Sequence, residues 1–315
     1  MGDGSTLWLP EAASTVASDV DGLFYFILNT SLVLFVGVIG VAAWFAYKFR
    51  RRSDADRPQP FKESKWVEAS WIIIPTLLVV IVFTWGFKLF IKMSIAPPNA
   101  YEITVRAAKW SWLFEYPNGV RSNELHVPVH RPVRLKMSSS DVIHSFFVPA
   151  FRVKQDVVPN RYTYVWFEAT QRDTFRVLCT EYCGQQHSTM LAKVVVASED
   201  DFTRWLAESM IDESLPPARH GELLYVQQGC QTCHSLDGAA SVGPTFLDLA
   251  GAVRSFTDGT SATADENYLR EAIINPSAVI VDGYEAVMPG QYGATLSSAE
   301  IDALIAFIQE QESTQ

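Results

Sequence analysis

One twelve-residue segment concentrates side chains that bind soft metals. Cys179, Cys183, His187 and Met190 follow the spacing C-x3-C-x3-H-x2-M, and a further imidazole, His144, lies upstream. Thiolate, thioether and imidazole ligands select copper over magnesium or calcium, and a methionine disfavours a structural zinc site. Because two thiolates, two imidazoles and a thioether exceed the needs of one blue-copper ion, the pattern predicts two coppers bridged by sulfur.

A disulfide between Cys179 and Cys183 is the alternative, because both residues are predicted below to lie in an oxidising compartment. Such a disulfide would close a loop of only five residues. It would also leave His187 and Met190 without a role, so we favour the metal site.

The second group of reactive side chains is Cys230, Cys233 and His234, which form the motif C-x-x-C-H. This motif attaches c-type haem through thioether bonds and turns the adjacent histidine to the iron. A thioredoxin-like redox pair is the alternative, but it needs a βαβ setting that the flanking sequence lacks. Met288 is the only methionine after residue 215, and His220 lies too close to Cys230 to reach the opposite haem face easily. We therefore expect Met288 to be the second axial ligand, which raises the reduction potential.

Two apolar segments near the start of the chain predict a transmembrane hairpin. No charge occurs in the 26 residues between Asp21 and Lys48, or in the 19 residues between Glu68 and Lys88. A helix needs ~20 apolar residues to cross a bilayer core, so we expect spans at about 22–47 and 69–91. Buried helices of a soluble protein are the alternative, but two such runs within one hundred residues are unusual in a globular core.

The segment between the two spans fixes the predicted orientation. It carries seven basic residues: Lys48, Arg50, Arg51, Arg52, Arg57, Lys62 and Lys65. The positive-inside rule places this loop in the cytoplasm of a bacterial-type inner membrane, with both termini and both predicted metal centres outside. No secretory signal is visible, so either it has been removed or the first span serves for insertion.

The rest of the chain predicts two further domains. Short alternating segments separated by turns indicate an antiparallel all-β sandwich or barrel. They lie at 103–105, 133–137, 162–167, 174–178 and 191–196. A helix at 198–210 follows, and then helices at about 218–231, 264–275 and 297–311, the last with Ser297 and Glu300 as a capping box. The predicted boundaries are 1–98 for the hairpin, 99–212 for the β domain and 213–315 for the haem domain.

The acidic balance of the chain belongs to the haem domain. The net charge is −10 overall, and residues 216–315 alone hold thirteen acidic and three basic residues. Such a surface repels nucleic acid and favours a basic protein partner. General acidity for solubility in a saline habitat is an alternative, and the two explanations are compatible.

The hairpin, the copper loop and residues 141–161 together resemble cytochrome c oxidase subunit II, whose cupredoxin domain holds the dinuclear CuA centre. The resemblance implies that Cys179 and Cys183 bridge the coppers, that His144 and His187 each terminate one, and that Met190 is a weak ligand. It further implies that the Glu181 carbonyl binds copper and that its carboxylate helps bind magnesium at the boundary with subunit I. Residues 218–311 resemble a class I cytochrome c with all-α fold, and the Gly243-Pro244 pair stands where that family supports the proximal histidine. The fusion resembles the caa-type haem–copper oxidases.

Two more residues acquire roles only through the resemblance. Trp110, in the aromatic stretch 109–116, matches the residue that admits electrons to copper; a core aromatic is the alternative. Glu68 matches a glutamate at the cytoplasmic mouth of a proton path into subunit I, and an interfacial glutamate held by headgroups or loop lysines is the alternative.

Together these features predict the electron-input subunit of a proton-pumping terminal oxidase. Electrons would pass from a cytochrome c-like or similar donor through one haem c and CuA to haem in subunit I, where dioxygen is reduced to water. The copper subunit of a nitric-oxide reductase and a freestanding membrane-tethered electron carrier are the alternatives. Glu68 and Glu181 count against the carrier, because their implied roles need a subunit I.

Overall fold

The structure is a computed structural model that describes residues 1–315 except 1–5, 54–56, 58–61, 211–214, 291 and 313–315. The chain divides into two compact units. One is the helical hairpin Val16–Ile95, and the other contains the rest of the chain. We describe each unit by itself.

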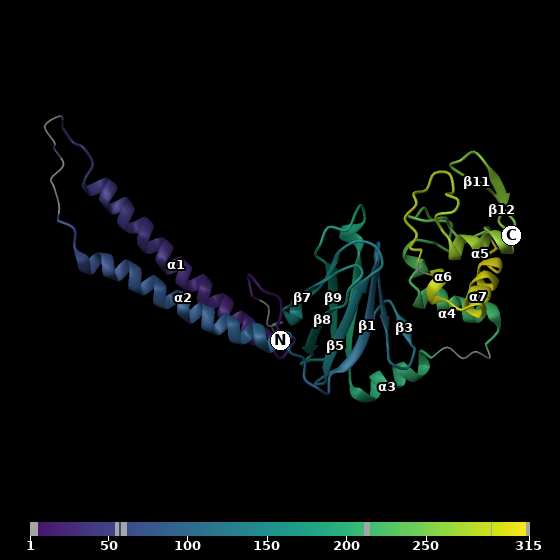
Figure 1. The fold of residues 1–315 in the computed structure, drawn as a ribbon, viewed down its shortest axis with the longest axis horizontal. Coiled ribbons are helices and arrows are strands. Elements are labelled where there is room, and N and C mark those ends of the chain that lie inside the picture. The colour runs from purple at the N-terminus through teal and green to yellow at the C-terminus, as the bar shows by residue number, and fades with distance from the viewer. Residues whose placement is uncertain (1–5, 54–56, 58–61, 211–214, 291, 313–315) are drawn as a thin grey trace. The chain divides into compact units, whose positions relative to one another are not determined.

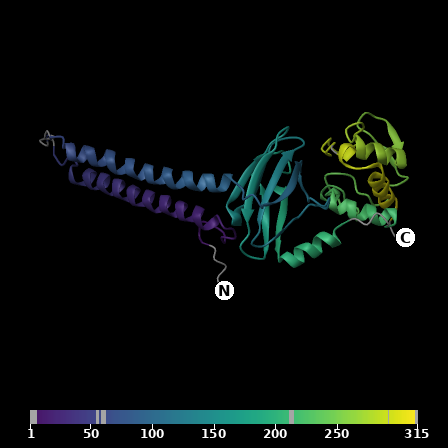
Figure 2. The ribbon, with the colours of Figure 1, turned by 60° about the horizontal axis from the view of Figure 1, so that its bottom comes forward.

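The hairpin consists of two long helices that lie side by side, α1 (Ala17–Lys48) and α2 (Lys65–Ser94) (Figures 1 and 2). Both are long and apolar enough to cross a membrane, and they extend beyond the predicted spans at each end. Most of their large apolar side chains are exposed, as a lipid-facing surface requires. At one end the Lys92 ammonium contacts the Asp19 carboxylate at 2.6 Å, which joins the first turn of α1 to the last turn of α2.

The β domain contains two five-stranded sheets. The first has the order β3-β2-β1-β5-β8 and the second β4-β10-β9-β6-β7. Strands of the first sheet are β1 (Tyr101–Ala108), β2 (Ser111–Glu115), β3 (Arg121–Ser122), β5 (Pro132–Ser139) and β8 (Thr163–Glu168). Strands of the second are β4 (Leu125–Pro128), β6 (His144–Val148), β7 (Val153–Val157), β9 (Thr174–Cys179) and β10 (Leu191–Ala197).

The predicted sandwich is present, but its sheets are mixed and not wholly antiparallel. Strand β1 pairs with β5 in parallel, and β4 pairs with β10 in parallel. Parallel neighbours need a long crossover connection, and β2, β3 and β4 lie within the connection from β1 to β5. The alternating pattern fixes which face of a strand is buried, but it does not encode the direction of the neighbouring strand. The prediction of antiparallel pairing was therefore wrong for these two pairs.

Alternation of side chains builds the core between the sheets. Along β5, Val133, Leu135 and Met137 are fully buried, whereas the residues between them are partly exposed. Large aromatic side chains fill the remaining space, and Phe146 and Phe167 are fully buried. This rigid core holds the ends of the strands, and the loops that join them, in fixed positions.

Residues 13–15 attach to the β domain ahead of the first membrane helix. The Ala13 amide donates to the Ala150 carbonyl at 2.9 Å, and the Thr15 amide donates to the Glu168 carbonyl at 3.0 Å. The Ser14 hydroxyl donates to the Phe151 carbonyl at 2.8 Å and is buried. The chain that leads into α1 therefore starts from the same domain to which the chain returns after α2.

Helix α3 (Glu199–Glu208) closes the β domain, with Ser198 as its N-cap. Its Trp205 ring stacks on the His126 ring at 3.9 Å between centroids and 10° between planes. Burial lowers the pKa of His126 to about 4, and the nearby Glu124 carboxylate only partly opposes this shift. A neutral His126 is therefore part of the native packing.

Acidification should destabilise this domain through His126. Its pKa is lower in the folded state, so between about pH 6.5 and pH 4 the unfolded state binds more protons and stability falls as pH falls. The loss should approach ~3 kcal/mol at most. A His126→Phe variant keeps an aromatic ring on Trp205 but binds no proton, so its unfolding temperature should fall less over this range. Calorimetric curves with equal acid slopes for both proteins would contradict this account.

The haem domain contains the helices α4 (Pro217–Gln227), α5 (Glu266–Ile274), α6 (Tyr292–Thr295) and α7 (Ser298–Gln309). The predicted capping box of α7 is present: the Glu300 amide donates to the Ser297 hydroxyl, and the Ser297 amide donates to the Glu300 carboxylate. At Gly221, α4 packs so closely on α7 that a Cβ would lie 2.7 Å from Phe307 Cβ. A short hairpin of β11 (Val253–Ser255) and β12 (Ser261–Thr263) adds a small sheet to the helical domain.

Candidate copper and haem centres

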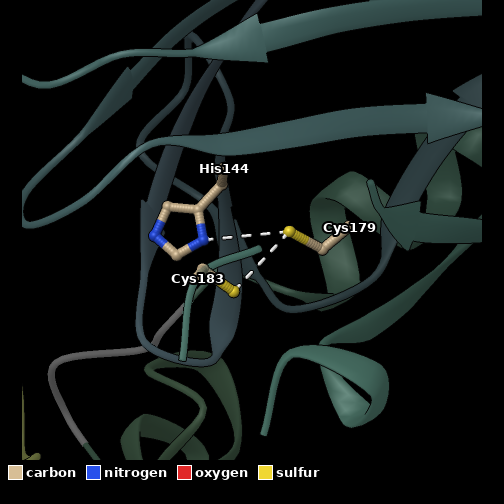
Figure 3. Close-up of side chains that lie close together, drawn as sticks. All are labelled: His144, Cys179 and Cys183. Carbon is tan, nitrogen blue, oxygen red and sulfur yellow. Dashed lines mark hydrogen bonds between the residues drawn. The ribbon is translucent and has the colours of Figure 1, made fainter. Parts of the chain in front are cut away.

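The predicted copper ligands meet at one end of the second sheet. His144 begins β6 and Cys179 ends β9, and these strands pair with Phe146 opposite Cys179. The loop 180–190 then brings Cys183 back to the same place. Ligand atoms of the three residues lie within 4.8 Å of one another, and Figure 3 shows their side chains converging.

Each imidazole in the cluster faces a different sulfur. His144 Nδ1 lies 3.9 Å from Cys179 Sγ, and His187 Nδ1 lies 3.5 Å from Cys183 Sγ. The two sulfurs are 3.8 Å apart, and both cysteines are free thiols. A disulfide is therefore not the arrangement that the structure adopts, and two sulfurs flanked by two imidazoles suit a sulfur-bridged metal pair.

The two remaining predicted ligands lie in the same cluster. Met190 Sδ is 3.8 Å from Cys183 Sγ and fully buried, and the Cys179 thiol donates to the Glu181 carbonyl at 3.4 Å. This donor set, soft sulfur with imidazole and one carbonyl, fits copper.

The thiols of the pair differ in acidity. Burial alone would raise the pKa of Cys179, but hydrogen bonds from His144 and from backbone amides outweigh burial and lower it. Burial and the negative charge of Cys179 raise the pKa of Cys183. Two adjacent thiolates repel each other, so the second is stabilised only when a cation lies between them.

Trp110 lies directly against the copper loop. Its indole nitrogen donates to the Cys183 carbonyl at 3.3 Å. Gly184 makes this approach feasible, because a Cβ there would lie 3.1 Å from the Trp110 ring and its φ of +122° is unfavourable for other residues. The indole therefore contacts the backbone of a predicted copper ligand.

The haem motif lines a cavity of about 160 Å³ in the C-terminal domain. Cys230, Cys233, His234 and Met288 all contribute to its wall, together with mostly apolar side chains. Burial raises the pKa of Cys230 to about 12, so this thiol is neutral in the unliganded domain. The apolar lining and the cysteine pair fit covalent haem.

The proximal histidine is held in one orientation. His234 Nδ1 lies 2.7 Å from the Pro244 carbonyl, which leaves Nε2 available to iron, so the expected support from Gly243-Pro244 is present. Gly243 lies so close that a Cβ would be 2.6 Å from His234 Cε1. The Phe246 ring stacks on the imidazole at 4.7 Å.

Comparison with known proteins agrees with both centres. Three family models match in order along the chain: the transmembrane domain of cytochrome c oxidase subunit II at residues 3–89, its periplasmic domain at 119–198, and cytochrome c at 218–312. The two subunit II models together match more than half of the chain. This chain belongs to the cytochrome c oxidase subunit II family, and it carries a C-terminal cytochrome c domain.

Two relatives of this chain are proteins named cytochrome c oxidase subunit 2. The protein of Alkalihalophilus pseudofirmus is 28% identical over 299 residues, which cover 90% of this chain and 85% of that protein. The protein of Synechocystis is 28% identical over 249 residues, covering 63% and 75%. Among solved structures, the periplasmic domain of cytochrome oxidase subunit II of Bradyrhizobium japonicum is 28% identical, with a TM-score of 0.35, covering 36% of this chain and 96% of that one.

Asp141 was not identified from the sequence as a hydrogen-bond partner of His144 in the copper cluster. Its carboxylate lies 2.9 Å from His144 Nε2 and accepts hydrogen bonds from the Lys109 and Val142 amides at 2.7 and 2.6 Å. Since Nε2 is engaged, Nδ1 is the nitrogen that faces Cys179. The signal in the sequence was the spacing D-x-x-H, which identifies no partner without the fold.

Removing this carboxylate should weaken copper binding. An Asp141→Ala variant frees the His144 ring to rotate, and loss of such an orienting partner lowers metal affinity by about 10–100-fold. Competition with a copper chelator measures the change. An Asp200→Ala variant, on the exposed start of α3, is the matched control. Equal copper affinity in the two variants would show that Asp141 does not orient His144.

The structure places Glu68 and Glu181 but does not test the proton-path role of Glu68 or the magnesium role of the Glu181 carboxylate. Glu68 lies in the first turn of α2 and is partly exposed. The Glu181 side chain is also exposed, and no described carboxylate forms a metal-binding group with it. The proton-path and magnesium roles therefore remain predictions.

Proposed function

We propose that this chain is the electron-input subunit of a respiratory haem–copper oxidase. It accepts electrons at its haem cleft and delivers them through its sulfur cluster to subunit I, which reduces dioxygen to water and pumps protons. The observation that carries this proposal is the presence, in one membrane-anchored chain, of a C-x-x-C-H cleft and a two-sulfur, two-imidazole cluster.

We assign the ligands of the copper and haem centres to the following residues. Cys179 and Cys183 would bridge the coppers; His144 and His187 would terminate them; Met190 and the Glu181 carbonyl would complete the set. Cys230 and Cys233 would hold haem, with His234 and Met288 as axial ligands. Bound copper and haem would supply one-electron redox chemistry, and the chain's own contribution is to fix its ligands in a rigid core. Such rigidity limits reorganisation during electron transfer.

Both ends of the hairpin belong on the same side of the membrane. Residues 13–15 hydrogen-bond to the β domain, and the chain re-enters that domain after α2. Because the connecting segment is basic, this common side is the extracytoplasmic side. We infer an inner-membrane subunit with the copper and haem centres in the periplasmic space.

The donor is best matched by a cytochrome c-like or other carrier with a basic face. The haem domain carries thirteen acidic residues against three basic ones, and opposite charge speeds docking. We further propose that Trp110 admits electrons to copper, given its hydrogen bond to the Cys183 carbonyl. Glu68 at the proton-path entrance and a magnesium ion at Glu181 complete the proposal.

Affinity purification of the full chain from its native membrane tests the function. The proposal expects a large haem-containing subunit I to co-purify and the complex to consume oxygen from a reduced donor. A complex that turns over nitric oxide and no oxygen would make the chain part of a nitric-oxide reductase. Isolation of the chain alone, with both centres loaded, would identify a freestanding carrier.

A further inference from the structure

Arg121 joins the β domain to the haem domain. It lies in β3, and one nitrogen of its guanidinium is 3.5 Å from the carboxylate of Glu300, a residue in the first turn of α7. Another nitrogen is 3.9 Å from the Glu115 carboxylate of its own β domain. The side chains of Arg121 and Glu300 are each only 23% exposed. We refer to these two residues as the interdomain ion pair, and solvent screens it less than it screens a fully exposed pair.

The haem domain holds the Glu300 carboxylate in a fixed orientation. One of its oxygens accepts a hydrogen bond from the Ser297 amide at 2.7 Å in the capping box of α7, and the other oxygen faces Arg121. A carboxylate that is already oriented loses little side-chain freedom when it pairs with a cation. Two turns further along the same helix, Leu304 and Ile308 line the haem cavity. The ion pair therefore acts on the helix that forms part of the cavity wall.

Two further contacts lie at the same boundary between the domains. The Gln227 side chain at the end of α4 donates to the carbonyl of Ser209, the residue that follows α3, at 3.1 Å. A Cβ on Gly229 would lie 4.0 Å from the Cβ of Ser111 in β2. A cavity of about 540 Å³ remains beside these contacts, and both members of the interdomain ion pair line it. The boundary is therefore open to dissolved ions.

This docking places the haem cavity next to Trp110. Lys109 and Ser111, the residues on either side of Trp110, contribute to the cavity wall together with the C-x-x-C-H residues. The Trp110 indole donates to the Cys183 carbonyl in the copper loop. The segment 109–111 therefore contacts both the haem cavity and the copper cluster. Because electron tunnelling slows steeply with distance, rapid transfer between the centres needs both contacts to be kept.

The ion pair has to maintain this docking across a small interface. Interfaces between domains of one chain resemble transient protein complexes, so domain motion is the default. A short tether raises the effective concentration of the two surfaces only to the order of millimolar. The docked and undocked forms then lie close in free energy, and one ion pair can shift the balance between them.

We propose that Arg121 and Glu300 hold the haem domain against segment 109–111 of the β domain. Arg121 is then a positioning residue for electron transfer from haem to copper. That consequence rests on the proposed function, whereas the docking itself does not.

Pulsed electron paramagnetic resonance on the full chain tests the docking directly. Nitroxide labels carried by noncanonical amino acids replace the exposed residues Lys193 of the β domain and Glu271 of the haem domain. The unaltered pairing should give one narrow distance. Arg121→Gln should lower the ratio of docked to undocked protein about fivefold, the upper end for ion pairs that solvent reaches. Glu300→Gln should lower it equally, because glutamine keeps the capping box but not the charge.

A double variant and a control separate the ion pair from general destabilisation. Arg121→Gln combined with Glu300→Gln should be no worse than either single variant, because both remove the same contact. Arg134→Gln removes an ion pair within the β domain, that with Glu102 at 3.4 Å, and should leave the distance unchanged. Salt at 1 M, where the Debye length is ~3 Å, should broaden the distances in the unaltered chain more than in Arg121→Gln.

The outcomes distinguish this proposal from the proposed function. A distance distribution in Arg121→Gln that equals the one in Arg134→Gln overturns the docking role, and so does a double variant whose effect is the sum of the single ones. If Arg121→Gln does not fold, Glu300→Gln decides by the same comparison. Flash reduction of haem in the same proteins should show slower copper reduction wherever the docked fraction falls. A chain that docks but never passes electrons from haem to copper would instead refute the proposed function.

Discussion

A Cys183→Ser variant should lose the dinuclear copper centre while retaining covalent haem. Cys183 Sγ contacts Cys179 Sγ, His187 Nδ1 and Met190 Sδ at 3.5–3.8 Å, so its loss removes contacts to three other predicted ligands. Serine oxygen is a poor ligand for soft copper. We expect the copper content to fall from about two ions per chain to about one or none, and oxidase turnover to fall with it.

Metal analysis and electron paramagnetic resonance measure this loss. The reciprocal control is Cys233→Ser, which removes a haem thioether but no predicted copper ligand, and should leave copper content unchanged. A Cys183→Ser protein that still binds two coppers with an unchanged resonance spectrum would show that its sulfur does not bridge them.

The second large effect is expected at the haem. A His234→Ala variant removes the axial ligand whose Nδ1 is held by the Pro244 carbonyl, so the ordinary spectrum of c-type haem should disappear. Electron entry from the donor should slow by more than about tenfold, since no other described histidine lines the cleft. Copper absorption should remain.

His220→Ala is the matched control, because His220 lies in α4 and outside the cleft. It should keep the haem spectrum. Loss of copper absorption together with haem in His234→Ala would contradict the independence of the two centres, and an unchanged haem spectrum would contradict the assignment of His234.

Short-range motifs made the main sites predictable. The spacing C-x3-C-x3-H-x2-M lies within one loop, so its ligands must lie close together whatever the fold, and C-x-x-C-H is equally local. The uncharged runs before Lys48 and Lys88 predicted two helices because hydrophobic length is a one-dimensional property. The Ser297–Glu300 capping box is local too, and the structure confirms it.

Features that depend on distant parts of the chain were not predictable. The parallel pairing of β1 with β5 depends on a crossover that no local pattern encodes. Asp141 was visible as a residue, but its hydrogen bonds to His144 and to the Lys109 amide, 32 residues away, appear only in the fold.

The central claim is that electrons enter at the haem domain and leave through the copper cluster. Flash injection of a single electron into the purified oxidase, followed at the haem c, copper and subunit I bands, tests it most directly. We predict that haem c is reduced first, that its reoxidation coincides with copper reduction, and that the subunit I haem is reduced last. Reduction of the subunit I haem without a preceding copper signal, or copper reduction that is equally fast in His234→Ala, would contradict this order.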